Sequence, residues 1–397
     1  MKVCGLDVHK DTVFCAVHNG KKTEGVKEYS TVTSSIRAMG EFLKGQGICR
    51  VAMESTGTYW IPIWNILEEQ GFDLLLVNPF LIKQMPGRKS DVKDAQWIAL
   101  LLHKGMLRGS LVPNARIREL RVYERKYRKL QGRMTSVVQE MDRTLVMSNI
   151  RLGSYVSDLN GKSFQRVVQA IANGSDSPEE LLCHVHPRIR NKHAHTIKDA
   201  LEGFICPHHR FALSLLLDEY GLLASQAEQC LTMMGDICAG HYARETEILK
   251  THPGISDIAA MTFIAESGGD MGAFENSGKF SGWTGLRPRN DESAGKYKST
   301  ATTKGNKFLR TILVQIAWAA IRTKGSHYQG KYARLAIRKS KKKALIAIAR
   351  KIGTVLWNML DKKEMYNADM LPVYDPIKLS AKIAYHDKEL LRLQSLV

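Results

Sequence analysis

The stretch Met1–His9, MKVCGLDVH, decides the fold of the first part of the chain. It is an apolar, β-rich run that carries an acid, Asp7, in its middle. An ionised carboxylate in such a strand is costly unless it meets a cation or a hydrogen-bond partner. The run is therefore the first expected strand, and Asp7 is the first candidate site residue.

Further strands and helices follow up to about residue 110. β-rich runs at Thr12–Asn19 and Lys27–Thr33 precede the first expected helix, which starts at Ser34. Apolar strands at Arg50–Met53 and Phe72–Val77 flank a second helical segment. Three strands followed by alternating helices and strands predict an α/β layer with a mixed sheet.

Three more carboxylates extend the pattern around Asp7. Glu54 ends an apolar strand, and Asp91 and Asp94 open a helix. Asp91 and Asp94 are three residues apart, so they lie on one helical face. The four acids form an oxygen-rich set suited to Mg²⁺ or Mn²⁺, and two such ions would clamp the attacking and leaving oxygens of a phosphodiester. Taken alone, Asp91 is equally explained by the helix dipole, and Asp7 by an actin-like nucleotide fold.

The composition of the chain favours a nucleic-acid partner. The 397 residues include 58 Lys+Arg against 39 Asp+Glu, a net charge of +19, and a balance this basic is typical of proteins that bind a polyanion. Hydrophobic residues make up 44%, which excludes wholesale disorder, and the length predicts roughly two to three domains. The seven cysteines form no CxxC pair, and no apolar run approaches ~20 residues. The first residues are predicted to form a charged strand, so we do not expect a signal peptide. We therefore expect a cytoplasmic protein with no membrane partner.

A long amphipathic helix is expected from Ile117 to about Asn149, because apolar residues recur there at spacings of three, four and seven. A second helical stretch covers residues ~150–245. The first of these is also basic. Within the eighteen positions 116–133 its basic residues are Arg116, Arg118, Arg121, Arg125, Lys126, Arg128, Lys129 and Arg133. Such a run is either a solvated face or a nucleic-acid contact, and the sequence leaves both open.

Ser293 lies in a small-residue loop within a region rich in Pro, Gly and Ser that runs from Leu249 to about Gly305. A serine that attacks a phosphodiester needs steric access and nearby cations, which Arg287, Arg289 and Lys296 supply. A lone loop serine is nonetheless usually a turn residue, so the loop by itself does not establish a nucleophile.

Further basic residues follow the loop. The segment from Arg322 to Lys351 carries eleven Lys or Arg and no acid, and we expect it to contact phosphates. Together with Arg287, Arg289 and Lys296, the candidate nucleic-acid contacts are Lys304, Lys307, Lys341, Lys342 and Lys343.

The motifs of the first part, in their order, resemble the DEDD transposases of the insertion-sequence 110 family. The matching stretches are Gly5–Asp11, Glu54–Tyr59, Asn78-Pro79 and Lys89–Ala95. The resemblance implies an RNase H-like domain of the kind found in RuvC Holliday-junction resolvases. It also implies that Asp7, Glu54, Asp91 and Asp94 are a metal-binding tetrad.

The second half resembles the C-terminal transposase domain of the same family. The stretches that carry the resemblance are Pro253–Ile255, Gly285–Pro288, Glu292–Lys296 and Lys304–Arg310. In the family a serine is usually followed by two glycines, and this chain has Ala294 at the first of those positions. The resemblance implies that Ser293 is a nucleophile that forms a covalent phosphoserine link to DNA.

The expected organisation has four parts. They are a RuvC-like DEDD domain over residues 1–112, a helical or coiled-coil linker over 113–245, a mainly α transposase domain with Ser293 over 246–330, and a basic helical tail over 331–397. The resemblance implies donor and target DNA, a structured bridge RNA and a homo-oligomer, either dimer or tetramer, as partners. It places the protein in a prokaryotic cytoplasm, at the nucleoid when it acts.

Three other functions are compatible with parts of the sequence. A metal-dependent nuclease or resolvase would use water and leave Ser293 structural. A non-catalytic nucleic-acid-binding protein would keep the basic surface alone. An actin-like kinase is the third, and the lack of a second nucleotide-fold glycine motif argues against it.

Two residue groups invite other functions that we do not expect. Cysteines and histidines gather at Cys183, His184, His186, His193, His195, Cys206, His208 and His209, but their spacing fits no standard zinc finger. We expect a polar helical surface there. Trp283, Trp318 and Trp357 have apolar neighbours and are expected to be core residues rather than base-stacking platforms.

Overall fold

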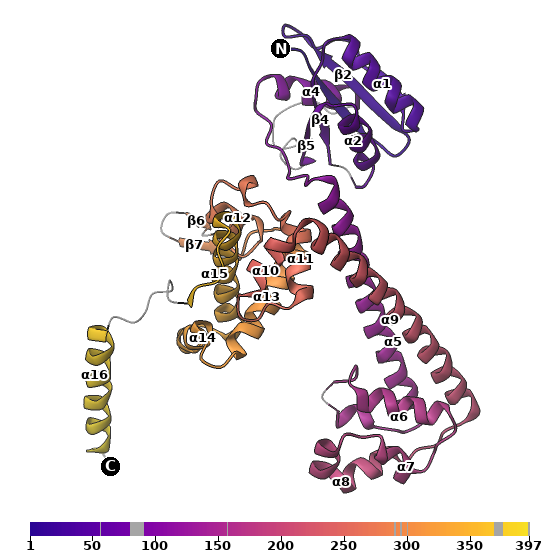
Figure 1. Cartoon of the computed structure of the whole chain (residues 1–397), viewed down its shortest axis with the longest axis vertical. Coiled ribbons are helices and arrows are strands. Elements are labelled where there is room, and N and C mark those ends of the chain that lie inside the picture. The colour runs from indigo at the N-terminus through magenta and orange to yellow at the C-terminus, as the bar shows by residue number, and fades with distance from the viewer. Residues whose placement is uncertain are drawn as a thin grey trace. The chain divides into compact units, whose positions relative to one another are not determined.

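The chain divides into two compact units, Met1–Pro113 and Asn114–Val397, in a computed structural model (Figure 1). The structure describes residues 1–55, 57–79, 91–156, 158–289, 291–293, 296–299, 301–368 and 376–395.

The first unit is built on a five-stranded mixed sheet. Its strands are β1 (Val3–Val8), β2 (Thr12–His18), β3 (Lys27–Ser30), β4 (Arg50–Glu54) and β5 (Asp73–Val77). Their order across the sheet is β3-β2-β1-β4-β5. The first three strands pair antiparallel, whereas β4 runs parallel to both β1 and β5. This is the RuvC-like mixed α/β arrangement, so the predicted fold class is confirmed.

Alternation along β1 gives the sheet two different faces. Leu6 and Val8 belong to a core that also contains residues of α1 (Thr33–Gly45) and α2 (Trp60–Glu69). Gly5 and Asp7 point to the opposite face, against which α4 (Asp91–His103) packs. The first helix begins with Val32 as its N-cap residue, slightly before the predicted Ser34, and no side chain among the described residues caps it.

A long helical hairpin dominates the start of the second unit. The helices α5 (Ala115–Met147) and α9 (Pro207–His241) run side by side along its length (Figure 1). Buried Leu130, Val137 and Leu145 of α5 share a core with Leu213 and Leu223 of α9. The turn between them carries the short helices η1 (Leu152–Ser154), α6 (Lys162–Ala172), α7 (Pro178–Cys183) and α8 (Pro187–Leu201).

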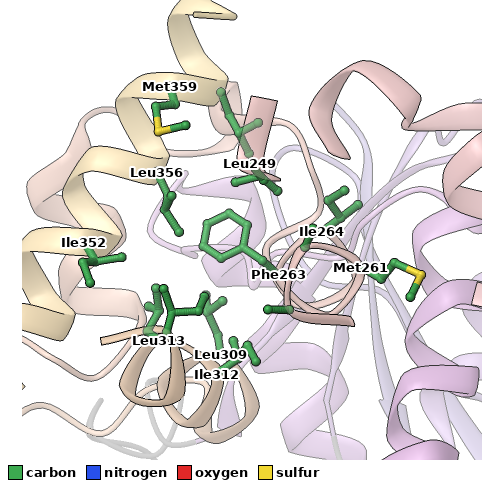
Figure 2. Packing of buried hydrophobic residues seen from close by; sticks show 14 of the residues in the cluster. Leu249, Met261, Phe263, Ile264, Leu309, Ile312, Leu313, Ile352, Leu356 and Met359 are labelled. Atoms are coloured by element: carbon green, nitrogen blue, oxygen red, sulfur yellow. The ribbon is translucent and has the colours of Figure 1, made fainter. Parts of the chain in front are cut away.

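At the other end of this hairpin lies a second helical core. It is formed by α10 (Ala243–Lys250), α11 (Asp257–Ser267), η2 (Met271–Ala273), α12 (Ser277–Trp283), α13 (Lys307–Arg322), α14 (His327–Arg338) and α15 (Lys341–Lys362). Figure 2 shows Phe263 of α11 among Leu313 of α13 and Leu356 of α15. Each fully buried side chain of this size stabilises the fold by about 1.5–3 kcal/mol.

The basic segment that follows α13 is part of this core. Lys341, Lys342 and Lys343 are exposed in the first turn of α15, and the later residues Ile348 and Ile352 are fully buried. The prediction that Trp318 lies in the core is wrong, because its side chain is 42% exposed on the outer side of α13. The unit ends with α16 (Pro376–Gln394), and no helix within the described ranges combines the length and apolar character needed to cross a membrane.

Candidate active site

Asp7 lies near the end of β1, on the face of the sheet that α4 covers. Two residues earlier, Gly5 brings α4 unusually close, because a Cβ at Gly5 would lie 2.5 Å from the Ala95 carbonyl oxygen and 2.3 Å from the Ala99 amide nitrogen. Only a glycine allows this approach of helix to strand. The first turn of α4, which contains Asp94, is thereby held over the end of β1 that carries Asp7.

Glu54 reaches the same end of the sheet from the neighbouring strand. β1 and β4 are parallel with Leu6 opposite Met53, so Asp7 and Glu54 follow that pair on adjacent strands. Because both residues come one position later, their side chains emerge on the α4 face. The register of the sheet therefore brings together two acids that are almost fifty residues apart in sequence.

The electrostatics of Asp7 reflect this convergence. Its side chain is buried, and desolvation raises the pKa of the carboxyl group above its ordinary value. The His9 imidazole, whose Nε2 lies 3.2 Å from Asp7 Oδ2, lowers that pKa, and the charges of Glu54 and Asp94 raise it. Three of the four predicted acids therefore interact. Asp91 is the first residue of α4, but its side chain lies outside the described residues.

This donor set fits a divalent cation. A buried carboxylate beside two further carboxylates is an arrangement that a positive charge relieves, and carboxylate oxygen is the ligand that Mg²⁺ and Mn²⁺ prefer. The sequence motif Gly5–Asp11 includes His9 but did not indicate a role for it. Its signal was its position two residues after Asp7, which places both side chains on one face of the strand.

Ser293 ends a short strand in the second unit. β6 (Asp291–Ser293) pairs antiparallel with β7 (Lys296–Ser299), with Ser293 opposite Lys296. The side chains of residues 291–298 lie outside the described residues. The pairing continues away from Ser293, where the Arg289 amide donates to the Ala301 carbonyl at 3.0 Å and the Thr303 amide donates to the Arg287 carbonyl at 2.9 Å. We call residues 287–289, 291–293, 296–299 and 301–303 the Ser293 ribbon.

The ribbon has a tightly built base next to α12 and α13. The Asn306 amide donates to the Trp283 carbonyl at 3.0 Å, and Thr303 Oγ1 donates to the Gly282 carbonyl at 3.0 Å. A Cβ at Gly305 would lie 2.3 Å from the Trp283 carbonyl oxygen, so the two arms meet too closely for any larger residue. Ser293 is therefore displayed at the far end of a ribbon whose base is fixed.

The candidate phosphate contacts occupy two places in the second unit. Arg287, Arg289, Lys304 and Lys307 are exposed on or beside the ribbon, whereas the Lys296 side chain lies outside the described residues. The lysines at 341–343 are exposed in the first turn of α15. Their exposure leaves these cations accessible to a polyanion.

The basic residues of α5 divide into two sets. Lys126, Lys129 and Arg133 are exposed, as either a solvated face or a nucleic-acid contact requires. Arg121, Arg125 and Arg128 instead contact groups inside the unit. The sequence interpretations did not include these internal contacts.

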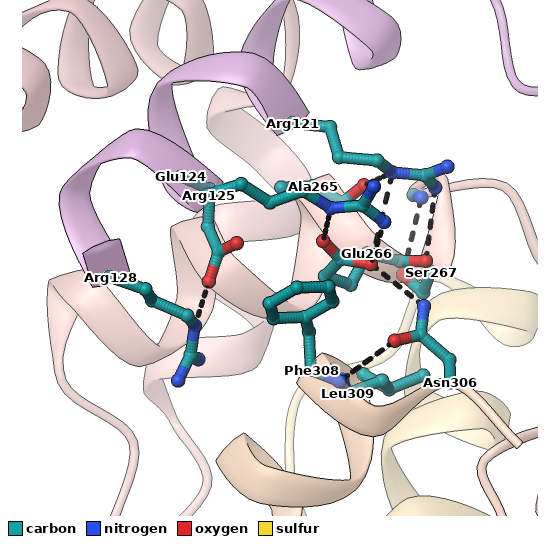
Figure 3. Close-up of polar contacts among 11 residues, drawn as sticks. Arg121, Glu124, Arg125, Arg128, Ala265, Glu266, Ser267, Asn306, Phe308 and Leu309 are labelled. Atoms are coloured by element: carbon teal, nitrogen blue, oxygen red, sulfur yellow. Dashed lines mark hydrogen bonds and ion pairs between the residues drawn. The ribbon is translucent and has the colours of Figure 1, made fainter. Parts of the chain in front are cut away.

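The partners of these arginines were not foreseen from the sequence. Arg125 pairs with Glu266, a fully buried residue near the end of α11, and Arg128 pairs with the equally buried Glu124 (Figure 3). Glu266 did carry a signal, because it follows the apolar run 258–265 as Glu54 follows its strand. Nothing local in the sequence marked its partner Asn306.

One group of soft ligands is also brought together. Among the residues that the structure describes, the ligand atoms of Cys206, His208 and His209 all lie within 4.8 Å of one another. Asp7, Glu54 and Asp94 do not form so tight a group in the described part of the chain. The Cys206 amide donates to His209 Nδ1 at 3.2 Å, and the Cys206 side chain accepts from the His209 amide, so these residues cap α9. Capping accounts for the placement of Cys206 and His209.

Comparison with known proteins follows the same division of the chain. The RuvC-like fold with acids at its strand ends defines the first unit as a DEDD-type domain. Residues 4–149 match the family described as Transposase of the DEDD IS110 type, and residues 246–333 match that described as Transposase IS116/IS110/IS902 family. Together the two matches cover more than half of the chain. The chain belongs to the IS110 family of transposases, as the sequence motifs indicated.

Individual relatives match over shorter spans. A transposase of Sinorhizobium fredii is 26% identical over 155 residues, which are 38% of this chain and 36% of that protein. The transposase for insertion sequence element IS1111A of Coxiella burnetii is 30% identical over 126 residues, 30% of this chain and 33% of that protein. The chain thus spans about a third of the length of these curated relatives. Among solved structures, Thermus thermophilus RuvC in complex with a Holliday junction substrate is 17% identical, with a TM-score of 0.22, over 28% of this chain and 99% of RuvC.

Proposed function

We propose that this protein is a transposase that cuts and rejoins DNA at an insertion sequence through a covalent link between Ser293 and DNA. One observation carries the proposal. A single chain holds both a set of converging carboxylates at the strand ends of a RuvC-like sheet and a serine displayed on a ribbon flanked by exposed cations. Water-dependent hydrolysis would need only the first of these two features.

The carboxylates of the first unit are the proposed metal ligands. Asp7, Glu54, Asp91 and Asp94 would hold Mg²⁺ or Mn²⁺, which supplies neutralisation of the charge that builds up on the reacting phosphate. His9 contacts the Asp7 carboxylate and restricts its orientation. The burial of Asp7 keeps one side of the site dry, which strengthens its attraction for a cation.

The chemical step at Ser293 conserves the number of phosphoester bonds. The serine Oγ loses its proton and forms a bond to phosphorus, while the bond from phosphorus to one sugar oxygen breaks. The departing sugar oxygen takes up a proton, so the proton count is unchanged. A sugar hydroxyl that later attacks the phosphoserine reverses the step and rejoins the strand. Rejoining therefore needs no nucleotide hydrolysis, which agrees with a chain whose sequence carries no complete P-loop motif.

The family resemblance adds an RNA guide and an oligomer to the proposal. Exposed cations on the ribbon and α15 supply a surface to which nucleic-acid phosphates can bind. Along α9, Phe211, Leu215 and Leu222 are large apolar residues that remain exposed in the single chain. An apolar stripe of this kind on a long helix supports association with a second copy, as a dimer or as part of a tetramer.

Single-turnover cleavage of a labelled DNA substrate, with co-purified RNA present, tests the proposal. We expect a protein–DNA adduct that survives denaturant with the native chain and no adduct and no cleavage with Ser293→Ala. Cleavage without an adduct would favour the nuclease that uses water. Binding without cleavage by the native chain would favour a non-catalytic nucleic-acid-binding protein. RNA and DNA binding should survive Ser293→Ala, because binding depends on the basic surface.

A further inference from the structure

The base of the Ser293 ribbon is joined to α5 through one asparagine. Asn306 caps α13, since its Oδ1 accepts hydrogen bonds from the Phe308 amide at 3.0 Å and the Leu309 amide at 3.1 Å. Its other side-chain atom, Nδ2, donates to Glu266 Oε2 at 2.7 Å (Figure 3). Asn306 therefore lies at the base of the ribbon, caps α13 and contacts a buried carboxylate at the same time.

Glu266 in turn is bound to α5. Arg125 donates to both of its carboxylate oxygens, from Nε at 2.9 Å and from Nη2 at 3.2 Å. Arg121 donates to the carbonyls of Ala265 and Glu266 at 3.0 and 3.1 Å, and so satisfies the open carbonyls at the end of α11. We call Arg121, Arg125, Glu266 and Asn306 the Glu266 cluster.

A second contact follows the same route. The guanidinium of Arg125 lies 4.6 Å from the ring centroid of Phe308, two residues after Asn306. An arginine over an aromatic face is attracted to the ring, more strongly where water is excluded. Arg125 thus contacts the base of the ribbon both through Glu266 and through α13.

We infer that Glu266 is a positioning residue for Ser293, which it serves by holding Asn306, and with it the base of the ribbon, against Arg125 of α5. This inference rests on the proposed function, because positioning matters only if Ser293 attacks a DNA phosphate. The bidentate pair fixes the direction as well as the distance between the two groups, which a single point contact does not. Misplacement of a reacting group by ~1 Å costs about 100-fold in rate.

The chain contains a matched control for this ion pair. Glu124 is also a carboxylate with no solvent exposure, and it is bound by Arg128 on the same helix. That pair lies within α5, four residues apart, and in the described part of the chain Glu124 interacts with Glu266 through charge without a hydrogen bond to it or to Asn306. A role limited to stability would therefore give Glu124 and Glu266 similar effects, whereas a positioning role would separate them.

The test exchanges donor and acceptor at the Asn306 contact. Asn306→Asp retains a good helix cap but places a carboxylate against Glu266. We expect the single-turnover rate constant of adduct formation at saturating DNA to fall by about 10- to 100-fold, with the DNA concentration for half-saturation unchanged. The double variant Glu266→Gln/Asn306→Asp restores one amide and one carboxylate in reversed places. We expect it to recover part of the rate but not all of it, because the introduced glutamine keeps only one acceptor oxygen for Arg125. Glu124→Gln should lower thermal stability and leave the rate constant at the native value.

Hydrogen exchange gives a second readout that does not depend on DNA cleavage or adduct formation. The amides of Arg289 and Thr303 are bonded within the ribbon, so Asn306→Asp should speed their exchange and the double variant should restore their protection. If the native chain forms no adduct, the proposed function fails while these amides still test the positioning. Unchanged exchange in Asn306→Asp, or no recovery of protection in the double variant, would overturn the inference.

Discussion

Asp7 and Glu266 are both buried carboxylates next to apolar runs, yet their surroundings are opposite. Asp7 faces Glu54 and Asp94, and among the residues that the structure describes His9 is the group that lowers its pKa. Glu266 is enclosed by Arg121, Arg125 and Asn306. Burial of an acid therefore does not by itself indicate a metal site. The balance of its partners distinguishes a carboxylate that needs a cation from one whose charge is already compensated.

Removing the charge of Asp7 tests this difference most directly. We expect Asp7→Asn to abolish strand cleavage, because the site loses a proposed metal ligand, while the fold remains intact. Loss of one of several like charges relieves repulsion, so the midpoint of thermal unfolding should hold or rise. Cleavage assays and calorimetry on the same preparation measure both effects.

An active Asp7→Asn variant would remove the metal site from the proposal. The exposed Asp11, three residues after the strand, offers a matched acid, and Asp11→Asn should cleave at the native rate.

The same experiment on Glu266 should give the reverse outcome for stability. Glu266→Ala leaves Arg125 and Arg121 without their carboxylate partner and Asn306 Nδ2 without its acceptor. Water can solvate the partly exposed Arg125, so we expect a cost of about 1–3 kcal/mol, the penalty for unsatisfied polar groups. We expect the urea midpoint of the second unit to fall accordingly. A variant as stable as the native chain would show that the contacts of Glu266 do not contribute to the stability of the second unit.

The strands and acids of the first unit could be predicted because their signals are local. Alternation along β1 and the interruption of apolar runs by Asp7 and Glu54 are visible within a few residues. The parallel register then brings these acids together without further information. Only small offsets at helix ends, as at Ser34, separate the prediction from the structure.

The Glu266 cluster could not be predicted in the same way. Arg125 and Glu266 are separated by 141 residues and Asn306 follows Glu266 by 40, so no local pattern links them. Trp318 failed for a related reason. Its neighbours Ile316 and Ala317 are apolar and buried, but one further step of 100° along α13 places the tryptophan on the outer face.

His252 provides a third buried group, which is kept neutral instead of being paired with a charge. Its Nε2 lies 2.8 Å from Tyr328 Oη, and burial lowers its pKa from 6.5 to about 4. The folded chain then binds fewer protons than the unfolded chain between these two values, so stability should be lost as the pH falls from 6.5 towards 4. The loss attributable to His252 should be about 3 kcal/mol.

Urea unfolding of the native chain and of His252→Gln at several pH values measures this contribution. The variant should show a smaller loss over that window, because its side chain has no proton to gain. Parallel pH profiles for the two proteins would mean that His252 charges without cost in the folded state.

The smallest expected effect concerns the exposed lysines of α15, which make no ion pair with any residue in the described ranges and so differ from both buried acids. Neutralising Lys341, Lys342 and Lys343 with glutamine should leave stability unchanged within ~0.5 kcal/mol, since all three are exposed. Each phosphate contact that disappears should reduce the slope of log affinity against log salt by ~0.9 on duplex DNA. Glutamine at the exposed Lys2, Lys21 and Lys22 of the first unit removes the same charge elsewhere and should leave the slope unaltered. Equal slopes for the native chain and the α15 variant would assign these lysines to a solvated face, because a cation that contacts no phosphate releases no counterion when DNA binds.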